Sequence, residues 1–295
     1  MDPTRVVIFH HNDLDGRCSA AIIKKMYPAA VCYEVNYDKE IPVNQLAAND
    51  KLFIVDFTPS TEADWMRILN VTKDVVWIDH HTANIKKHKF YDMSIEGLRV
   101  DTKPSGAGAT WQYLYPDTPA PDAVTFTSDY DTWTFDFGMA TKCFEAGMST
   151  VDFSPEGKVW MDILSDDKMT RKNSTNTIID CGRIVLEYRK QWNKDVVKQC
   201  AFACEFEGLK VLACNAPWSN SSLFDSVADR NEFDILSVFK STGDKVIVSL
   251  YSPDEKTDCA TLAQKHGGGG HRGAAGFECQ NLPFTNIKKL GATGE

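Results

Sequence analysis

The sequence predicts an α/β protein whose N-terminal part is built on a parallel sheet. Three short apolar runs, rich in the branched and aromatic residues that favour buried strands, each end abruptly in acidic or histidine side chains. They occupy residues 5–9, 52–55 and 75–78. Segments with helical character follow the first two runs, and strands that alternate with helices are typical of βαβ units in a parallel sheet.

At 295 residues the chain is long enough for two domains. We expect a first domain over residues 1–177, a helical linker over 178–200 and a smaller α/β domain over 201–295. In the linker, apolar positions such as Ile184 and Leu186 are interrupted by charged residues, as in one long helix. The strands and the helix expected in the last domain lie at residues 210–214, 233–239, 245–251 and 259–266.

The first strand, residues 5–9, runs into a polar turn that contains Gly16 and then into a helix over residues 18–26. Glycine permits a tight turn close to a ligand, and the helix N-terminus behind it favours anions. Residues 31–37 alternate apolar and polar side chains, which indicates a second strand.

The apolar run that follows is succeeded by a helix over residues 62–69, which Thr58 or Ser60 could cap. Beyond the last of the three runs, a stretch of small residues opens a helix that Pro116 ends, and residues 123–130 indicate another helix. These segments complete the doubly wound pattern expected for the first domain.

Composition narrows the classes of function. The net charge of −9 argues against a long nucleic-acid duplex as the main partner, but not against short anionic substrates held by metal ions. The nine cysteines include no C-x-x-C pair, so we expect reduced thiols in a cytoplasm rather than a structural zinc site. We find no signal peptide and no apolar run of about 18 residues, so neither secretion nor a membrane span is expected.

Metal-binding side chains gather at the ends of the three runs and in one later loop. They are His11, Asp13, Asp15, Asp56, Asp79, His80, His81, Asp129 and Asp131. At the carboxyl edge of a parallel sheet these groups can converge on one crevice, where so many carboxylates would repel each other unless cations compensate them. A single aspartate after a strand is usually a helix cap, but four such clusters in one chain predict a metal site. Either His10 or His11, and either Asp129 or Asp131, could supply the ligand.

The donor types indicate which metal is expected. Carboxylates and imidazoles without thiolates suit Mn²⁺, Fe²⁺, Co²⁺ or Zn²⁺ better than Ca²⁺. The donors exceed what one ion needs, so we expect two ions, roughly 3.5–4 Å apart, that share a bridging carboxylate. Such a pair activates water near neutral pH and stabilises an in-line displacement at phosphorus.

These motifs resemble those of the DHH phosphoesterases, which include RecJ-type exonucleases, short-oligonucleotide nanoRNases, pAp phosphatases and cyclic-dinucleotide phosphodiesterases. The resemblance covers nearly the whole chain. Its five motifs occur in order at residues 11–16, Asp56, residues 79–81, residues 130–133 and residues 267–277. It implies a Rossmann-like, parallel-sheet DHH domain and a C-terminal substrate domain that carries the GGGGH signature.

The resemblance also implies a role for each matched position. The cofactor would be two manganese ions, which Mg²⁺ or Co²⁺ could replace. His11 and Asp13 would bind one ion, and Asp15 and His80 would bind the other. Asp56 would bridge the two ions, and Asp131 would complete a site. His81 would contact the scissile phosphate or stabilise developing charge, and Asp79 would orient a neighbouring imidazole. The substrate-binding residues would be Gly268, Gly269, Gly270, His271, Arg272 and Ser105. Trp133 and Trp218 are the tryptophans expected to stack on a base.

The expected reaction is hydrolysis of short single-stranded oligonucleotides to mononucleotides by the two metal ions. The match of residues 130–133 to nanoRNase-like members and the acidic composition favour this substrate. The alternatives are a pAp phosphatase, a phosphodiesterase for cyclic or linear dinucleotides, and, in another class, a non-catalytic nucleotide-binding scaffold. The partner would be the oligonucleotide or another small nucleotide, with no membrane, and a homodimer is allowed for.

Overall fold

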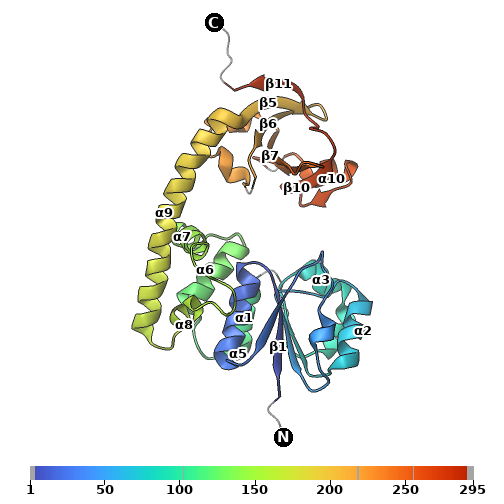
Figure 1. Cartoon of the computed structure of the whole chain (residues 1–295), viewed down its shortest axis with the longest axis vertical. Coiled ribbons are helices and arrows are strands. Elements are labelled where there is room, and N and C mark those ends of the chain that lie inside the picture. Colours follow the sequence, from blue (N-terminus) through green and yellow to red (C-terminus); the bar gives the residue numbers. More distant parts are fainter. Residues whose placement is uncertain (1–3, 102, 218, 255, 291–295) are drawn as a thin grey trace. The chain divides into compact units, whose positions relative to one another are not determined.

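The computed structural model describes residues 4–101, 103–217, 219–254 and 256–290. The chain folds into two compact units, residues 1–186 and 187–295, each with its own sheet (Figure 1). The α/β class and the parallel sheet expected from the sequence are confirmed. No helix among the described residues is long and apolar enough to cross a membrane.

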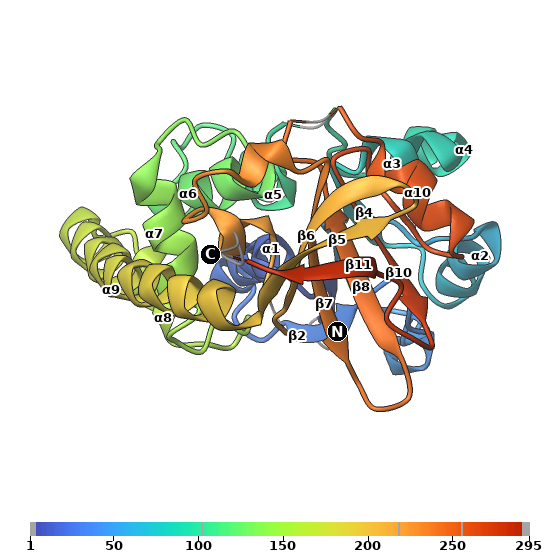
Figure 2. The same cartoon turned by 90° about the horizontal axis from the view of Figure 1, so that it is seen from above.

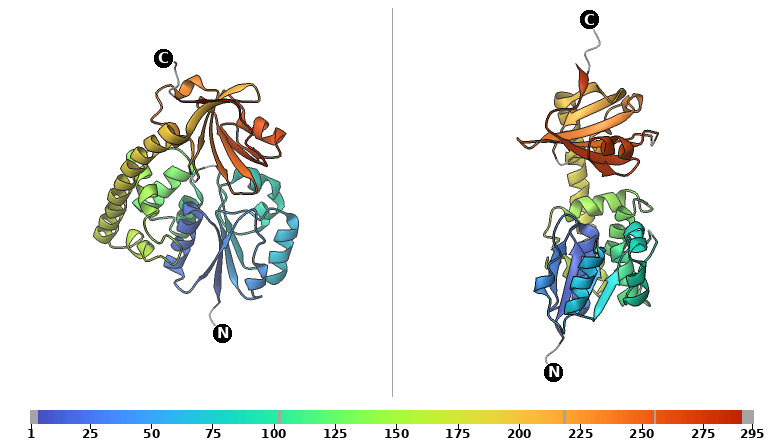
Figure 3. Two further views of the ribbon diagram at one scale, coloured as in Figure 1. Left: turned by 45° about the horizontal axis from the view of Figure 1, so that its top comes forward. Right: turned by 90° about the vertical axis from the view of Figure 1, so that its right-hand side faces the viewer.

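The first unit contains a four-stranded sheet in which every pairing is parallel. In sheet order its strands are β2 (Val31–Val35), β1 (Val6–His11), β3 (Lys51–Val55) and β4 (Val75–Ile78). Strands β1, β3 and β4 are almost wholly buried, which explains their continuous apolar runs. The sheet stands between two layers of helices (Figure 3).

Alternate residues along the strands pack into different helical layers. Phe9 and Ile54 pack with Trp65 in one apolar cluster, whereas Ile8 and Phe53 belong to a second cluster. The helices of the first layer are α2 (Glu62–Val71), α3 (Thr82–Lys87) and α4 (Lys89–Ser94), with the 3-10 turn η1 (Val43–Gln45). The helices of the second layer are α1 (Leu14–Met26) and α5 (Gly106–Leu114).

Further helices pack outside α1 and α5 around a third apolar cluster. They are α6 (Asp122–Asp131), α7 (Met139–Met148), α8 (Val159–Ile163) and α9 (Lys168–Cys200). Helix α9 begins at Lys168, before the start expected at residue 178, because its first turns are almost entirely polar and show no apolar periodicity. The division between the two units falls inside this helix, after Leu186.

The second unit contains a seven-stranded mixed sheet, seen from above in Figure 2. In sheet order its strands are β11 (Thr285–Lys289), β5 (Ala201–Phe206), β6 (Leu209–Asn215), β7 (Ile235–Ser241), β8 (Val246–Tyr251), β10 (Ala274–Cys279) and β9 (Gly269–Gly270). Only the pairing of β6 with β7 is parallel. Helix α10 (Cys259–Lys265) covers one face, and the 3-10 turn η2 (Ser221–Phe224) covers the other; η3 (Arg230–Glu232) precedes β7.

Candidate metal centre

The ends of three parallel strands bring the expected donors to one edge of the first sheet. His10 in β1 lies opposite Val55 in β3, and Val55 lies opposite Ile78 in β4. The residues that follow are therefore His11, Asp56 and Asp79, and they emerge side by side. This is the carboxyl edge at which open α/β sheets bind ligands.

The turn between β1 and α1 contributes two more carboxylates. Asp13 caps the helix, because its Oδ1 accepts a hydrogen bond of 2.8 Å from the Gly16 N–H. A Cβ at Gly16 would lie 2.4 Å from the carbonyl oxygen of His11, so only glycine fits the turn. Asp15 then points inward from the first turn of α1 and is 2 % exposed.

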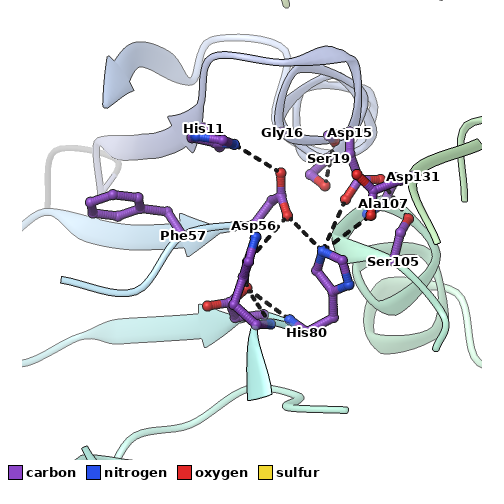
Figure 4. Close-up of polar contacts among 12 residues, drawn as sticks. His11, Asp15, Gly16, Ser19, Asp56, Phe57, His80, Ser105, Ala107 and Asp131 are labelled. Atoms are coloured by element: carbon purple, nitrogen blue, oxygen red, sulfur yellow. Dashed lines mark hydrogen bonds and ion pairs between the residues drawn. The ribbon is translucent and has the colours of Figure 1, made fainter. Parts of the chain in front are cut away.

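The described residues form three sets of donors, one of which is Asp56, Asp79, His80 and His81. The other two lie on either side of Asp56, and Figure 4 shows Asp56 between His11 and His80. In the first, His11 Nδ1 lies 2.7 Å from Asp13 Oδ2 and 3.7 Å from Asp56 Oδ2. In the second, His80 Nε2 lies 3.3 Å from Asp131 Oδ2 and 3.9 Å from Asp15 Oδ2. Asp56 Oδ1 is 3.2 Å from His80 Nε2, so Asp56 adjoins both sets. The donor atoms within each set all lie within 4.8 Å of one another.

The central carboxylates carry buried oxygens that no hydrogen bond compensates within the described part of the chain. These are Oδ2 of Asp15 and both oxygens of Asp56, which is 1 % exposed. Burial and the Asp56 charge raise the pKa of Asp15 well above its ordinary value, and burial raises that of Asp56. Burial and the Asp15 charge raise the pKa of Asp131 to about 7. Buried carboxylates that crowd two imidazoles, with oxygens that lack hydrogen bonds, fit divalent cations, which would supply further positive charge.

Asp56 also has an unusual backbone. Its φ is +53°, in the left-handed region, which aspartate tolerates better than most residues. Such a conformation costs on the order of 1–3 kcal/mol and persists where the surrounding structure enforces it, often at functional sites.

Asp79 supports the site from beneath. It is fully buried, and its Oδ1 lies 2.8 Å from His81 Nδ1 and accepts a hydrogen bond of 2.7 Å from the His80 N–H. The Thr58 hydroxyl donates to its other oxygen. Burial alone would raise the pKa of Asp79, but the hydrogen bonds from His81 and Thr58 outweigh it and hold the pKa below its ordinary value. Asp79 thus fixes the His81 ring, which is about one-third exposed, beside Asp56 at 3.8 Å.

The N-terminus of α5 closes the site, and Ser105 is the one residue of this region that was expected at the site from the sequence. The Ser105 hydroxyl and the Ala107 N–H both donate to Asp15 Oδ1. Ser105 is fully buried, and its hydroxyl contacts a candidate metal ligand. Its expected contact with substrate stays a prediction. A Cβ at Gly106 would lie 2.6 Å from Asp56 Cβ and 2.8 Å from Asp15 Oδ2. The run of small residues that opens this helix was the sequence signal for this close approach.

The structure distinguishes the residues that the sequence left as alternatives. The ring of His10 turns away: its Nδ1 is 2.7 Å from the His11 carbonyl oxygen, and it lines a separate cavity of about 300 Å³ with Arg17 and Glu34. Asp129 accepts hydrogen bonds from the loop that follows α6 instead of facing His80. Within the described residues, His11 and Asp131 are therefore the members of each pair that join the donor sets.

The glycine run of the second unit forms a tight hairpin. Gly269 and Gly270 pair with β10, and the N–H of His271 donates to the Ala274 carbonyl oxygen at 2.8 Å. Gly270 has a φ of +141°, and a Cβ there would lie 2.6 Å from Ala275 Cα. A Cβ at Gly268 would lie 2.0 Å from the Gly276 carbonyl oxygen.

The side chains of His271 and Arg272 are exposed at the tip of this hairpin. The Nη1 atom of Arg272 lies 3.9 Å from Oδ2 of Asp258. Trp218, one of the two tryptophans expected to stack on a base, lies outside the described residues.

The chain is similar to several known proteins in sequence or in structure. Residues 5–131 match the model of the DHH family, N-terminal domain. An uncharacterised protein of Acanthamoeba polyphaga mimivirus is 28% identical over 316 residues, covering 98% of this chain and 72% of that protein. The solved DHH domain of a member of the s1p family of ribosomal proteins is 13% identical with a TM-score of 0.59, covering 96% of this chain and 83% of that chain. Exonuclease RecJ bound to manganese is 15% identical with a TM-score of 0.47, covering 92% and 85%.

Proposed function

The N-terminal part of this chain, residues 5–131, belongs to the DHH family, and on that basis we propose that the protein is a metal-dependent phosphoesterase. Its proposed reaction is hydrolysis of the phosphodiester bonds of short oligonucleotides to mononucleotides. The observation that carries the proposal is Asp56, a buried carboxylate whose oxygens adjoin two separate sets of metal donors.

The proposed cofactor is a pair of divalent ions, with manganese preferred and magnesium or cobalt as substitutes. His11 and Asp13 would hold one ion and Asp15, His80 and Asp131 the other, while Asp56 would bridge them. When bound, such ions provide a nucleophilic hydroxide near neutral pH and neutralise charge on the phosphate oxygens. Both ions would also relieve the repulsion among the buried carboxylates.

The proposed role of His81 is to contact the phosphate. Its Nδ1 faces Asp79, and no hydrogen bond to Nε2 is found among the described residues, so that edge of the ring could donate to a phosphate oxygen. Asp79 orients the His81 ring through its contact with Nδ1, and hydrogen bonds from the His80 N–H and the Thr58 hydroxyl hold Asp79 in place. Because Asp79 is buried, water does not compete for that contact. Substitution of Thr58 or Asp79 would therefore remove contacts that orient the His81 ring.

The proposed substrate grip lies in the second unit. The exposed His271 and Arg272 offer donors to a terminal phosphate, and the hairpin of Gly268, Gly269 and Gly270 would let backbone N–H groups approach it. The acidic composition supports short substrates, because long duplexes need a basic surface.

The experiment is a turnover panel in Mn²⁺ on dinucleotides, short and long oligomers, pAp, a cyclic dinucleotide and pyrophosphate. Asp56→Asn is the test variant, because asparagine tolerates the left-handed backbone. Asp117→Asn, at an exposed position, is the matched control.

Mononucleotide release from short oligomers that is lost in Asp56→Asn and kept in Asp117→Asn supports the proposal. Preference for pAp or a cyclic dinucleotide would retain the metal centre and replace the substrate. No turnover together with no bound metal would contradict the proposal and favour a non-catalytic nucleotide-binding protein.

A further inference from the structure

The loop that follows Asp131 holds two large aromatic residues in an unfavourable backbone conformation. Trp133 and Phe135 have φ values of +56° and +55°. Bulky residues rarely adopt this region, and where they do the surrounding structure must enforce it. The strain is therefore maintained by specific contacts of the loop.

Asp129 provides these contacts. Its buried carboxylate accepts hydrogen bonds from the N–H groups of Asp136 at 2.8 Å and Phe137 at 3.3 Å, and from the Thr141 hydroxyl. Its carbonyl oxygen accepts a further bond of 3.1 Å from the Thr134 N–H. Asp129 thus ties the middle of the loop through its carbonyl oxygen and the far end of the loop through its carboxylate, so the loop is preorganised.

Residues along the loop alternate between two environments. Thr132, Thr134 and Asp136 line a cavity of about 560 Å³ beside α5 and α6, and the two threonine hydroxyls lie 2.6 Å apart. Trp133 and Phe135 are not part of that lining. The loop thus turns Thr132 and Thr134 toward the cavity and leaves Trp133 and Phe135 outside its lining.

The aromatic residues form a group with Tyr130, the last tyrosine of α6. The ring centroids of Trp133 and Phe135 are 4.7 Å apart at 70°, and that of Tyr130 is 5.5 Å from Trp133. The Lys142 ammonium lies 5.0 Å from the centroid of Phe135. The rings of Tyr130 and Phe135 contact the Trp133 indole in edge-type arrangements. Trp133 is nevertheless 67% exposed, so much of its ring remains available to a ligand.

We propose that Trp133, supported by Tyr130 and Phe135, stacks on the nucleobase joined to the phosphate at the metal centre. This inference rests on the proposed function and specifies the substrate as base-bearing. Trp133 is two residues from Asp131, so their Cα atoms are at most about 7 Å apart, within the dimensions of one nucleotide. Base–aromatic stacking tolerates any base, so the loop would select for nucleotides over inorganic phosphates without selecting a sequence.

The test is equilibrium binding by titration calorimetry in Mn²⁺, with two phosphate monoesters that differ by a base. Adenosine 5′-monophosphate carries the base, and ribose 5-phosphate lacks it. The variants are Trp133→Ala, Trp133→Phe, which keeps a ring, and Phe90→Ala, the control at a 72% exposed phenylalanine of α4. Binding is measured because it does not depend on turnover.

We expect the wild type and Phe90→Ala to bind the nucleotide about 5- to 150-fold more tightly than the sugar phosphate. Trp133→Ala should abolish the difference while leaving the affinity for ribose 5-phosphate unchanged, and Trp133→Phe should keep part of it. Equal weakening of both ligands in Trp133→Ala, or no weakening of either, would overturn the inference.

The outcome is separable from that of the turnover panel. Hydrolysis of phosphodiesters without base-dependent binding at Trp133 would remove this inference alone. Base-dependent binding in a protein that hydrolyses none of the panel would retain the stacking loop and remove the proposed reaction.

Discussion

At Gly106, a side chain on α5 would collide with two of the candidate metal ligands. The sequence reveals the donors themselves, because acidic and imidazole groups at strand ends stand out against apolar runs. It does not reveal Gly106, because the space that excludes a side chain is created by Asp15 and Asp56 from other elements. The choice of His11 over His10 likewise depends on which way each ring turns at the end of β1.

Gly106→Ala should therefore weaken metal binding while leaving the fold intact. The new methyl group would meet Asp56 Cβ at 2.6 Å, so either the carboxylates or the start of α5 must move. We expect the Mn²⁺ affinity to fall at least about tenfold, since displaced ligands lose coordination geometry. Calorimetric titration with Mn²⁺ measures this, and circular dichroism checks the fold.

The control is Gly273→Ala, where a Cβ would meet open space. It should bind Mn²⁺ as the wild type does. Unchanged affinity in Gly106→Ala would contradict the placement of α5 against the donors.

Asp131 gives the metal-free protein a specific pH dependence. Burial and the Asp15 charge raise its pKa to about 7, above the ordinary value of about 3.9. The folded state therefore binds this proton more tightly than the unfolded state, and stability decreases as the pH rises between these two values. In Asp131→Asn the contribution is absent, so the stability of the variant relative to the wild type should increase between about pH 4 and pH 7.

Urea denaturation in the presence of EDTA across this range measures the two free energies of unfolding. A difference that stays constant with pH would show that Asp131 keeps an ordinary pKa. Added Mn²⁺ should remove the dependence in the wild type, because the bound cation displaces the proton.

At the scale of elements, helices α7 and α9 pack closely where each has a glycine, Gly147 in α7 and Gly182 in α9. A Cβ at Gly182 would lie 1.7 Å from the carbonyl oxygen of Cys143, and one at Gly147 would lie 2.0 Å from that of Ile178. Even alanine at Gly182 would force the helices apart, so we expect Gly182→Ala to lower the free energy of unfolding by about 1–3 kcal/mol. Chemical denaturation compares it with Ile184→Ala, at a 73% exposed position of the same helix.

The exposed substitution should change stability by less than about 0.5 kcal/mol. Equal effects of the two substitutions would contradict this close packing. This contact could not be predicted, since a glycine inside a helix shows only that its neighbour is close, not which neighbour it is.

Prediction of the elements succeeded where burial produces a pattern. The strands at β1, β3, β4, β6, β7 and β8 were expected because their apolar residues are continuous or alternate. Strand β11 was missed because all five of its residues are exposed, and β10 because it begins within the glycine and alanine run. Strand β5 follows α9 directly, with no turn residue to separate it from the expected linker.

At the scale of the whole molecule, metal and stability should be linked. A ligand that binds only the folded state stabilises it by about 2.7 kcal/mol at a concentration one hundred times its Kd. We therefore expect Mn²⁺ to raise the unfolding temperature of the wild type and EDTA to reverse the rise. In Asp56→Asn the metal effect should be lost, because the carboxylate that adjoins both donor sets is gone.

Scanning calorimetry of both proteins, with and without Mn²⁺, tests the two statements together. Asp117→Asn should behave as the wild type. A metal-dependent rise of equal size in Asp56→Asn would place the stabilising ion elsewhere in the chain.

The α/β architecture was predictable as a whole because strand and helix patterns alternate over the first unit. The order of the four strands was not predictable, because it depends on which strands pair with one another. The seven-stranded sheet of the second unit was harder to predict, because its edge strands show little hydrophobic pattern.

The common edge at which β1, β3 and β4 end constrains chain length as well as composition. One residue inserted within β3 would advance Asp56 by about 3.3 Å and turn its side chain toward the other helical layer. A residue inserted in the loops that enter these strands would instead be absorbed at the opposite edge. The first unit therefore has one margin at which insertions and deletions are prohibited and another at which the chain is free to lengthen.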